Sequence, residues 1–420
     1  MMHPNLSSDK LDRPRSELEL IFIIAFLAAF APLSTDMYLP AFPEIETYFA
    51  TSSGNVQLSL SSFFAAFALG QLVFGPLSDQ FGRKRPLYCG LLLFLASSLS
   101  CIFAPNIWVL IGLRFLQGLG ACAGAVISLA IVRDVFDGSR AVRTFSILAI
   151  VGGLAPMVSP VLGGFLLRVA SWKMIFWVLV VVGLFCLAAT SLRLPETARR
   201  KKRAVRGKLV LGAYWHVLKN PRFTLFTLGL SFTLAGLFAF ISGSPFVFMK
   251  LYGLSPWQYG VVFACNVVAM IIAANVNAMF VAKISPQKLL KTGSRMQVCF
   301  GLILLVTGVT GWGGMWGILI PIFCFSLCIN LIIPNATALA MAPFKRCAGT
   351  ASALLGAMQF AIASLTAMSM GLVGGNSALP MACAIALCGI LGCVCRHFAE
   401  QKSLGGKTPA GDAEEALPQE

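Results

Sequence analysis

The sequence predicts an all-α polytopic membrane protein with twelve transmembrane helices in two six-helix halves. Composition excludes a water-soluble domain, because 58% of the 420 residues are hydrophobic and only 11% are charged, whereas soluble domains carry about 25% charged residues. Apolar stretches long enough to cross a bilayer recur along the chain. We expect helices near 20–40, 56–76, 87–104, 108–131, 144–166, 174–194, 224–246, 257–281, 294–312, 316–340, 350–373 and 378–396.

The positions of the cations predict how these helices are oriented. All but four of the lysines and arginines fall in tails and loops on one side, and Arg396 near the C-terminus is assigned to that side too. Arg168, Lys173 and Lys250 are expected outside, and Arg114 is the one cation expected within a span. By the positive-inside rule, both termini are expected in the cytoplasm. The net charge of +16 therefore reflects topology, and no nucleic-acid partner is expected.

Charge and composition also divide the chain into segments. A basic linker begins at Leu194-Pro195-Glu196-Thr197, and we interpret it as a solvated inner segment near anionic lipid heads. The expected units are a cytoplasmic tail (1–19), an N-terminal half (20–194), the basic linker (195–222), a C-terminal half (223–397) and a disordered cytoplasmic tail (398–420).

The first span ends with Asp36, the only acid well inside a span, and a membrane carboxylate is by default a functional candidate. Counting from Leu20 at 1.5 Å per residue places Asp36 about 6 Å below the outer edge of a ~30 Å core, and the same count places Arg114 about 9 Å below it. We therefore expect Asp36 and Arg114 to be partners. The pair either takes part in function or is a static ion pair that joins two helices.

Residues 75–86 separate the second and third spans, and we expect them to form a cytoplasmic hairpin. Gly75 and Gly82 permit tight turns, Pro86 is expected to start the next helix, and three cations follow Gly82. The pattern G-x-L-x-D-x-x-G-R-K-R resembles the signature loop between helices 2 and 3 of the major facilitator superfamily.

That resemblance implies a gate at the inner rim. Its members would be Asp79 and Arg83, and Arg133 and Asp134 could join them. The start of the span near 350–373 offers free amides and the positive end of a helix dipole, so Asp79 is expected to latch onto it.

Two spans carry faces of small or kinking residues that allow close helix packing. The span near 108–131 places Arg114, Gln117, Gly118 and Ala121 on one face. The span near 144–166 places Gly153, Pro156, Pro160 and Gly164 on one flat face. The second face resembles the glycine- and proline-rich motif of antiporters in this superfamily, with Ala155-Pro156 where that motif has Gly-Pro.

The whole chain resembles the Bcr/CflA branch of drug:proton antiporters. The resemblance is carried by the segments at 35–40, 240–247, 252–255 and 348–356. It implies a bicyclomycin-resistance-like exporter of drug-like or amphipathic small molecules across the bacterial inner membrane, with two halves rocking about a central cavity. Asp36 would then be where proton and substrate compete, with Arg114 as its resting partner.

A census of titratable residues supports Asp36 as the coupling site. No Asp or Glu occurs between Glu196 and Glu400, and the three histidines lie in the tails or the linker. Candidate cavity residues are Tyr38, Phe63, Phe64, Phe67, Gln117, Phe240, Asn266, Asn330 and Gln359. Each aromatic residue could equally pack in the core or face lipid, and each amide could equally cross-link helices.

The expected partners are a small-molecule substrate, protons and membrane lipid. The proton gradient is the expected energy source, and no cofactor or metal is expected. Twelve helices suffice for a monomer. An enzyme is not expected, because the spans offer one acid, no histidine and no nucleotide-binding loop. The alternative function is proton-coupled export of one metabolite, an amino acid or a nucleoside, in the same fold.

Overall fold

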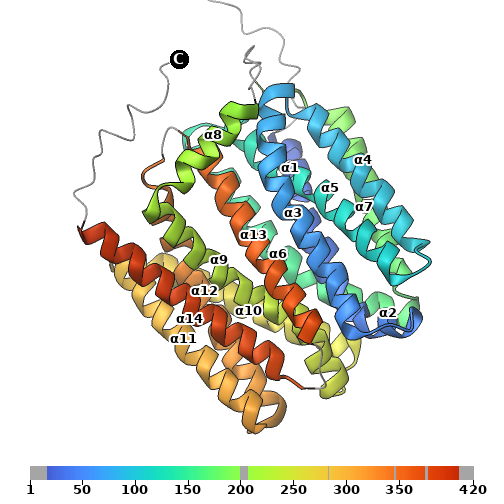
Figure 1. The fold of residues 1–420 in the computed structure, drawn as a ribbon. Helices are drawn as coiled ribbons and strands as arrows, with labels where there is room; N and C mark the ends of the chain where they lie inside the picture. The colour runs from blue at the N-terminus through green and yellow to red at the C-terminus, as the bar shows by residue number, and fades with distance from the viewer. Residues whose placement is uncertain (1–16, 199–206, 282, 345–346, 374–376, 406–420) are drawn as a thin grey trace, which may run out of the picture.

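The structure is a computed structural model that describes residues 17–198, 207–281, 283–344, 347–373 and 377–405. All regular secondary structure in these ranges is helical, and twelve helices within them are long and apolar enough to cross a membrane. The predicted fold class and number of spans are therefore confirmed. Figure 1 shows the helices as one bundle that splits into two groups.

The first group precedes residue 198. Its elements are α1 (Glu17–Asp36), the short 3₁₀ turn η1 (Leu39–Ala41), α2 (Phe42–Tyr48), α3 (Ser53–Phe81), α4 (Lys84–Ile102), α5 (Ile107–Val135), α6 (Gly138–Val169) and α7 (Lys173–Arg193). The second group follows the linker helix α8 (Gly207–Leu218). Its elements are α9 (Pro221–Pro245), the π-helical turn η2 (Phe246–Leu251), α10 (Pro256–Val281), α11 (Pro286–Thr310), α12 (Gly314–Met341), α13 (Ala348–Val373) and α14 (Leu379–Gly405).

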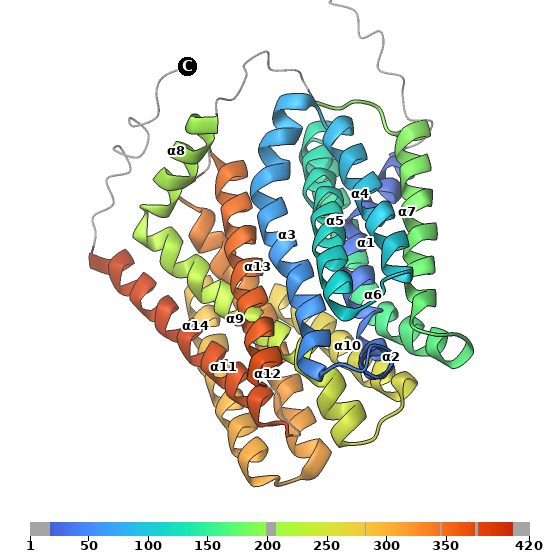
Figure 2. The ribbon, with the colours of Figure 1, turned by 45° about the vertical axis from the view of Figure 1, so that its right-hand side comes forward.

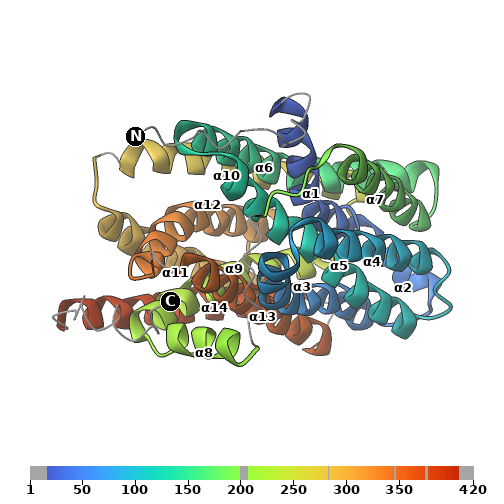
Figure 3. The same ribbon diagram turned by 90° about the horizontal axis from the view of Figure 1, so that it is seen from above.

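Two helix pairs make most of the contact between the groups, which we call the first and second halves. Helix α3 packs along α13, and α6 packs along α10. Figures 2 and 3 show both pairs side by side from different directions. Because the chain crosses the bundle an even number of times, α1 begins and α14 ends at the same end of it, where α8 also lies (Figure 1). We call this the α8 end, and the opposite end the α2 end.

The hairpin expected at 75–86 is shorter than predicted. Helix α3 continues through Gly75 and Pro76 to Phe81, so the expected turn at Gly75 is wrong. The turn itself lies at Gly82, whose φ of 86° favours glycine. A proline within a membrane helix is tolerated where neighbouring helices and side chains satisfy the freed backbone groups.

The linker and the last span also differ from the expectation. Residues 207–218 form a helix, α8, in which Tyr214, Val217 and Leu218 recur at helical spacing and pack against the second half. Helix α14 continues to Gly405, beyond the boundary expected at 397. The tail 1–16 and residues 199–206 lie outside the described residues.

The halves meet tightly at the α2 end. A Cβ added to Gly371 of α13 would lie 2.8 Å from the carbonyl oxygen of Gly54 in α3, so the two backbones touch there. Ser364 Oγ donates to the Ser61 carbonyl across the same interface at 2.8 Å. At the α8 end the same two helices line a cavity of about 490 Å³. The α3–α13 interface is thus closed at the α2 end and hollowed at the α8 end, while a second, more open hollow of about 470 Å³ lies between α2 and η2.

Candidate functional site

Arg114 lies fully buried in α5 and reaches the end of α1. Its Nη2 donates to the Ser34 carbonyl at 3.0 Å, and its Nη1 donates to Gln117 Oε1. The guanidinium carbon lies 4.5 Å from the Tyr38 ring centroid and 4.7 Å from that of Phe63, within the range of cation–π attraction. Arg114 Nε has no hydrogen-bond partner among the described residues. The Nε–H group therefore remains for another partner.

Asp36 is buried at the last residue of α1, but Arg114 is not its partner. Its carboxylate accepts a hydrogen bond from Thr35 Oγ1 at 2.9 Å. The expected Asp36–Arg114 ion pair is therefore wrong for this structure. The predicted depth was adequate, because Arg114 reaches Ser34 two residues away. The direction of the carboxylate around α1 depends on helix packing, which counting along the chain does not give.

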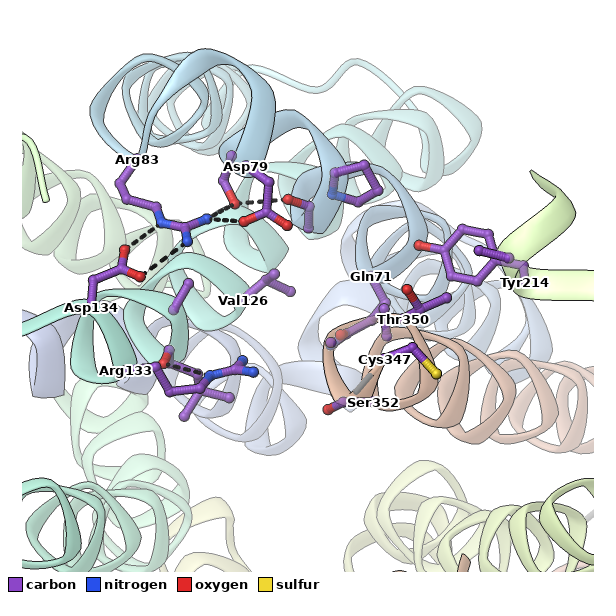
Figure 4. Close-up of a pocket in the computed structure, with 18 residues that line it drawn as sticks. Gln71, Asp79, Arg83, Val126, Arg133, Asp134, Tyr214, Cys347, Thr350 and Ser352 are labelled. Atoms are coloured by element: carbon purple, nitrogen blue, oxygen red, sulfur yellow. Dashed lines mark hydrogen bonds and ion pairs between the residues drawn. The ribbon is translucent and has the colours of Figure 1, made fainter. Parts of the chain in front are cut away.

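A second group of charges lies at the α8 end, around Arg83. This guanidinium donates from Nε to Asp134 Oδ2 at 2.7 Å and from Nη1 to Asp79 Oδ1 at 2.5 Å (Figure 4). Burial alone would lower the pKa of Arg83, but its hydrogen bonds to the carboxylates of Asp134 and Asp79 raise the pKa above the ordinary value. We call Arg83, Asp79 and Asp134 the Arg83 cluster. It joins α3, α5 and the turn before α4 within the first half.

The Arg83 cluster forms one wall of the 490 Å³ cavity. The opposite wall comes from Thr350 and Ser352 of α13, with Tyr214 of α8 beside them (Figure 4). The expected latch between Asp79 and this end of α13 is not formed, because the cavity lies between them and Arg83 occupies Asp79. Arg133 also lines the cavity but donates to the Leu129 carbonyl at 3.2 Å, outside the cluster.

Sequence reasoning missed the role of Glu196. Its carboxylate accepts the backbone N–H of Arg83 at 2.7 Å and that of Lys84 at 3.2 Å, which caps the start of α4. A Cβ on Gly82 would lie 2.6 Å from this carboxylate, so glycine is needed there for space as well as for φ. The signal was available, because the expected linker began at this acid.

Tyr214 is a second residue that sequence reasoning missed. Its hydroxyl donates to the Leu72 carbonyl of α3 at 3.2 Å, so a side chain from the linker contacts the first half. Burial raises its pKa, and the nearby Asp79 charge raises it further. The helical spacing of apolar residues in 210–218 could have predicted α8.

The aromatic candidates fall into three places. Tyr38 and Phe63 surround Arg114. Phe64 and Phe67 of α3 meet two rings of the second half, and the closest pair has centroids 4.3 Å apart. These four rings form what we call the aromatic cluster, which consists of Phe64, Phe67, Phe238 and Phe360. Phe240 stacks on Phe263 within the second half at 5.6 Å.

The aromatic cluster lies one helical turn beyond the cavity along α3 and α13. Gln71 lines the cavity one helical turn from Phe67. Its side chain packs against Gly356, which lies one turn from Phe360 in α13. The rings of Phe67 and Phe360 lie 4.5 Å apart, one from each half. Apolar rings therefore close the interior of the bundle above the cavity.

The polar candidates differ in how they are satisfied. Gln117 is fully buried and bridges Arg114 to Ser98, to whose Oγ it donates at 2.7 Å. Asn266 of α10 is buried, and its Nδ2 has no partner among the residues described. Asn330 of α12 likewise has an unpartnered Nδ2, and Gln359 of α13 is half-buried. A buried amide without a partner is costly unless another group binds it.

The glycine- and proline-rich face of α6 lies against α10. A Cβ on Gly164 would lie 2.6 Å from the Pro256 carbonyl oxygen, and one on Gly260 would lie 2.6 Å from the Pro160 carbonyl oxygen. Gly153 approaches Ile271 further along the same pair. Pro156 is also within α6. These four positions thus lie on a helix whose backbone is in contact with the other half.

One buried charge was assigned to the wrong place by sequence. Arg396 is 2% exposed inside the second half rather than in an inner segment. It donates to Ser294 Oγ at 2.7 Å, to the Gly229 carbonyl at 2.7 Å and to Thr233 Oγ1 at 2.5 Å. Arg114 is therefore not the only cation within a span. In the described part of the chain, no group of three or more His, Cys, Asp or Glu could hold a metal ion.

Comparison with known proteins decides the family. The family model described as Major Facilitator Superfamily matches residues 24–368. The chain belongs to the major facilitator superfamily. Among relatives of this major facilitator protein, the uncharacterized MFS-type transporter YdgK of Bacillus subtilis strain 168 is 36% identical over 381 residues, which cover 90% of this chain and 94% of YdgK.

A second relative specifies the branch. The bicyclomycin resistance protein homolog of Haemophilus influenzae is 29% identical and covers 94% of this chain and 99% of its own length. The resemblance to the Bcr/CflA branch is thereby confirmed. Among solved structures, a D-xylose-proton symporter superposes with a TM-score of 0.71 at 15% identity, over 89% of this chain and 97% of that one. The protein is therefore a multi-pass membrane transporter of small molecules within the major facilitator fold.

Proposed function

We propose that this transporter is a proton-coupled antiporter that exports drug-like or amphipathic small molecules. It acts as a monomer in the bacterial inner membrane, uses the proton gradient and needs no cofactor. The α8 end faces the cytoplasm, because the cations of the loops gather there. The name of the Haemophilus relative supports antibacterial compounds as one substrate class.

The position of Asp36 carries this proposal. Burying a carboxylate in a membrane span costs free energy, so such residues usually have a function. Asp36 has no cation partner among the described residues to offset this cost. It lies where α1 meets the second half, so a proton or a cationic substrate bound there affects both halves. Arg114, with one free donor two residues away, can stabilise Asp36 when no substrate is bound.

The asymmetry between the two ends supports alternating access. Along α3 and α13 the halves are in backbone contact at the α2 end, whereas the α8 end holds a drug-sized cavity. In this state, cargo enters the cavity from the cytoplasm. The aromatic cluster joins the two halves one turn beyond the cavity, so it must open before substrate moves deeper between α3 and α13.

Export of one dedicated metabolite is the second candidate. The unpartnered amides of Asn266 and Asn330 favour it, since fixed hydrogen-bond donors discriminate between polar substrates more than apolar rings do. An amino acid or a nucleoside supplies matching acceptors.

The test measures intracellular accumulation of bicyclomycin, chloramphenicol and tetraphenylphosphonium in bacteria that lack their own pumps. Cells express the native chain, Asp36→Asn, or the matched control Asp137→Asn, which alters an exposed acid. The native chain and Asp137→Asn are expected to lower accumulation of several compounds, and Asp36→Asn is expected to abolish export that depends on the proton gradient.

Two results would contradict the proposal. If the well-inserted native chain lowers the accumulation of none of the three compounds, the metabolite function takes its place. If Asp36→Asn exports as well as the native chain at equal expression, Asp36 is structural.

A further inference from the structure

The second half contains no acid between Glu196 and Glu400, yet it must respond when a proton binds Asp36 in the first half. A neutral hydrogen-bond donor from the second half would meet this requirement. Such a donor must be buried, close to the end of α1 and free to exchange partners.

The end of α1 is in close contact with the second half. The turn η1 begins at Leu39, three residues after Asp36, and packs against α9 and α10. Helix α6 touches both elements. A Cβ on Gly163 would clash with the Met37 carbonyl, and a Cβ on Gly164 would clash with the Pro256 carbonyl of α10. Asp36 is therefore held at a junction of α1, α6 and α10.

Tyr259 of α10 lies beside this junction. Its neighbour Gly260 packs against the Pro160 carbonyl of α6, and three residues further along α6 Gly163 packs against the Met37 carbonyl, next to Asp36. Tyr259 is 1% exposed, and its hydroxyl pairs with Ser244 Oγ at 2.9 Å. Ser244 Oγ can itself donate to the Ile241 carbonyl at 3.4 Å, which leaves Tyr259 as the donor within the pair. A tyrosine that donates to a neutral hydroxyl gains by donating to a carboxylate instead, because charge-assisted hydrogen bonds are stronger.

The first half contains an equivalent pair. The hydroxyl of Tyr38 and Ser59 Oγ are 2.8 Å apart, and Ser59 donates to the Val56 carbonyl at 2.6 Å. In each half the pair joins the end of the first span to the next span. The Tyr38 ring, however, is covered by the guanidinium of Arg114, so Tyr259 is the more available donor.

We propose that Tyr259 is the hydrogen-bond donor by which the second half recognises ionised Asp36. This rests on the proposed role of Asp36 in coupling. When Asp36 is ionised, the Tyr259 hydroxyl leaves Ser244 and donates to the carboxylate; when Asp36 is protonated, Tyr259 returns to Ser244. No proton is transferred between them. The charged and titratable groups around this exchange are Arg114 of α5 and Tyr38 beside η1, with Cys101 of α4 next to Arg114.

The test uses dicyclohexylcarbodiimide, an apolar reagent that modifies protonated carboxyl groups. The purified full chain is labelled across a pH series, and modification of Asp36 is read by mass spectrometry of the peptide. The variants are Tyr259→Phe, Ser244→Ala and, as a matched control, Tyr252→Phe, which removes a hydroxyl from a tyrosine at the α2 end.

Tyr259→Phe is expected to move half-labelling to higher pH, by about a tenfold change in proton concentration, because a donor to the charged form is lost. Ser244→Ala frees Tyr259 for the carboxylate and is expected to move it to lower pH. Tyr252→Phe is expected to match the native chain.

The proposal is overturned if Tyr259→Phe labels with the native pH profile or if Ser244→Ala shifts it in the same direction as Tyr259→Phe. The labelling needs no substrate, so it separates the two proposals. If the labelling profiles shift but export does not depend on Asp36, the Tyr259–Asp36 contact is supported and the proposed function is contradicted. If export depends on Asp36 but the profiles do not shift, the proposed function is supported and the contact is contradicted.

Discussion

Each half of the molecule buries one arginine within a membrane span, and the two are satisfied differently. Arg396 in the second half has an acceptor for each of its three nitrogens, from α9 and α11. Arg114 in the first half has two acceptors, two aromatic rings against its faces and one nitrogen left over.

This difference separates a structural charge from a functional one. A buried cation whose three nitrogens all have acceptors joins its neighbours and gains nothing by moving. Gly229 and Gly392 make room for Arg396, since a Cβ on either would meet its side chain. A buried cation with a free donor, two residues from the end of α1 that carries Asp36, can exchange partners. The same substitution in each half should therefore damage different properties.

Arg396→Met is expected to have the largest effect, and on stability. It leaves the acceptors on α9 and α11 unpaired and should lower the free energy of unfolding by about 3 kcal/mol. Thermal unfolding in detergent, followed with a thiol-reactive dye, measures this directly, because five of the thirteen cysteines are fully buried. Transport per folded molecule should remain near native. Near-native stability would show that the hydrogen bonds of Arg396 are dispensable.

Arg114→Met should mainly impair transport. We expect the loss to be about tenfold or more with a smaller loss of stability, because the rings and the apolar part of the side chain still pack. Export of tetraphenylphosphonium from proteoliposomes with an imposed proton gradient measures it. If Arg114→Met unfolds as readily as Arg396→Met and transports normally once folded, the two arginines do not differ in role.

The smallest effect is expected from breaking the ion pair that joins the two halves. In the described part of the chain, Lys250–Glu46 at 2.9 Å is the one ion pair that crosses between halves. Because Lys250 is half-exposed, breaking the pair should cost less than about 1 kcal/mol, or up to fivefold in the closed-to-open ratio at the α2 end.

Spin labels at Thr47 and Leu254, which line the same outer hollow, measure this ratio in a background without native cysteines. Glu46→Lys and Lys250→Glu should each lengthen the distances, and the double exchange should restore them. A double exchange as open as the single variants would mean that the pair contributes nothing to closure.

The sequence predicted where residues lie along a helix axis. It did not predict which way their side chains face, because that depends on the rotation of each helix about its axis. Long apolar runs gave twelve spans, and counting placed Asp36 and Arg114 at matching depth. Whether they face each other depends on packing, and they do not. Arg396 was misplaced because it follows an apolar run and precedes a charged tail, where sequence gives no depth. Asp79 was expected to latch onto α13, but its carboxylate pairs with Arg83 and a cavity lies between it and α13. That arrangement depends on how the two halves pack, which the sequence near Asp79 does not give.

The Glu46–Lys250 pair has a consequence for the surroundings of the protein. It lies at the α2 end with the lysine half in water, so dissolved ions screen it, over about 10 Å at 0.1 M salt. Higher ionic strength at that face weakens the ion pair, and lower ionic strength strengthens it. In the proposed orientation, with the α2 end outside the cell, higher external salt is therefore expected to raise, by a modest factor, the fraction of substrate-free transporter that is open to the exterior.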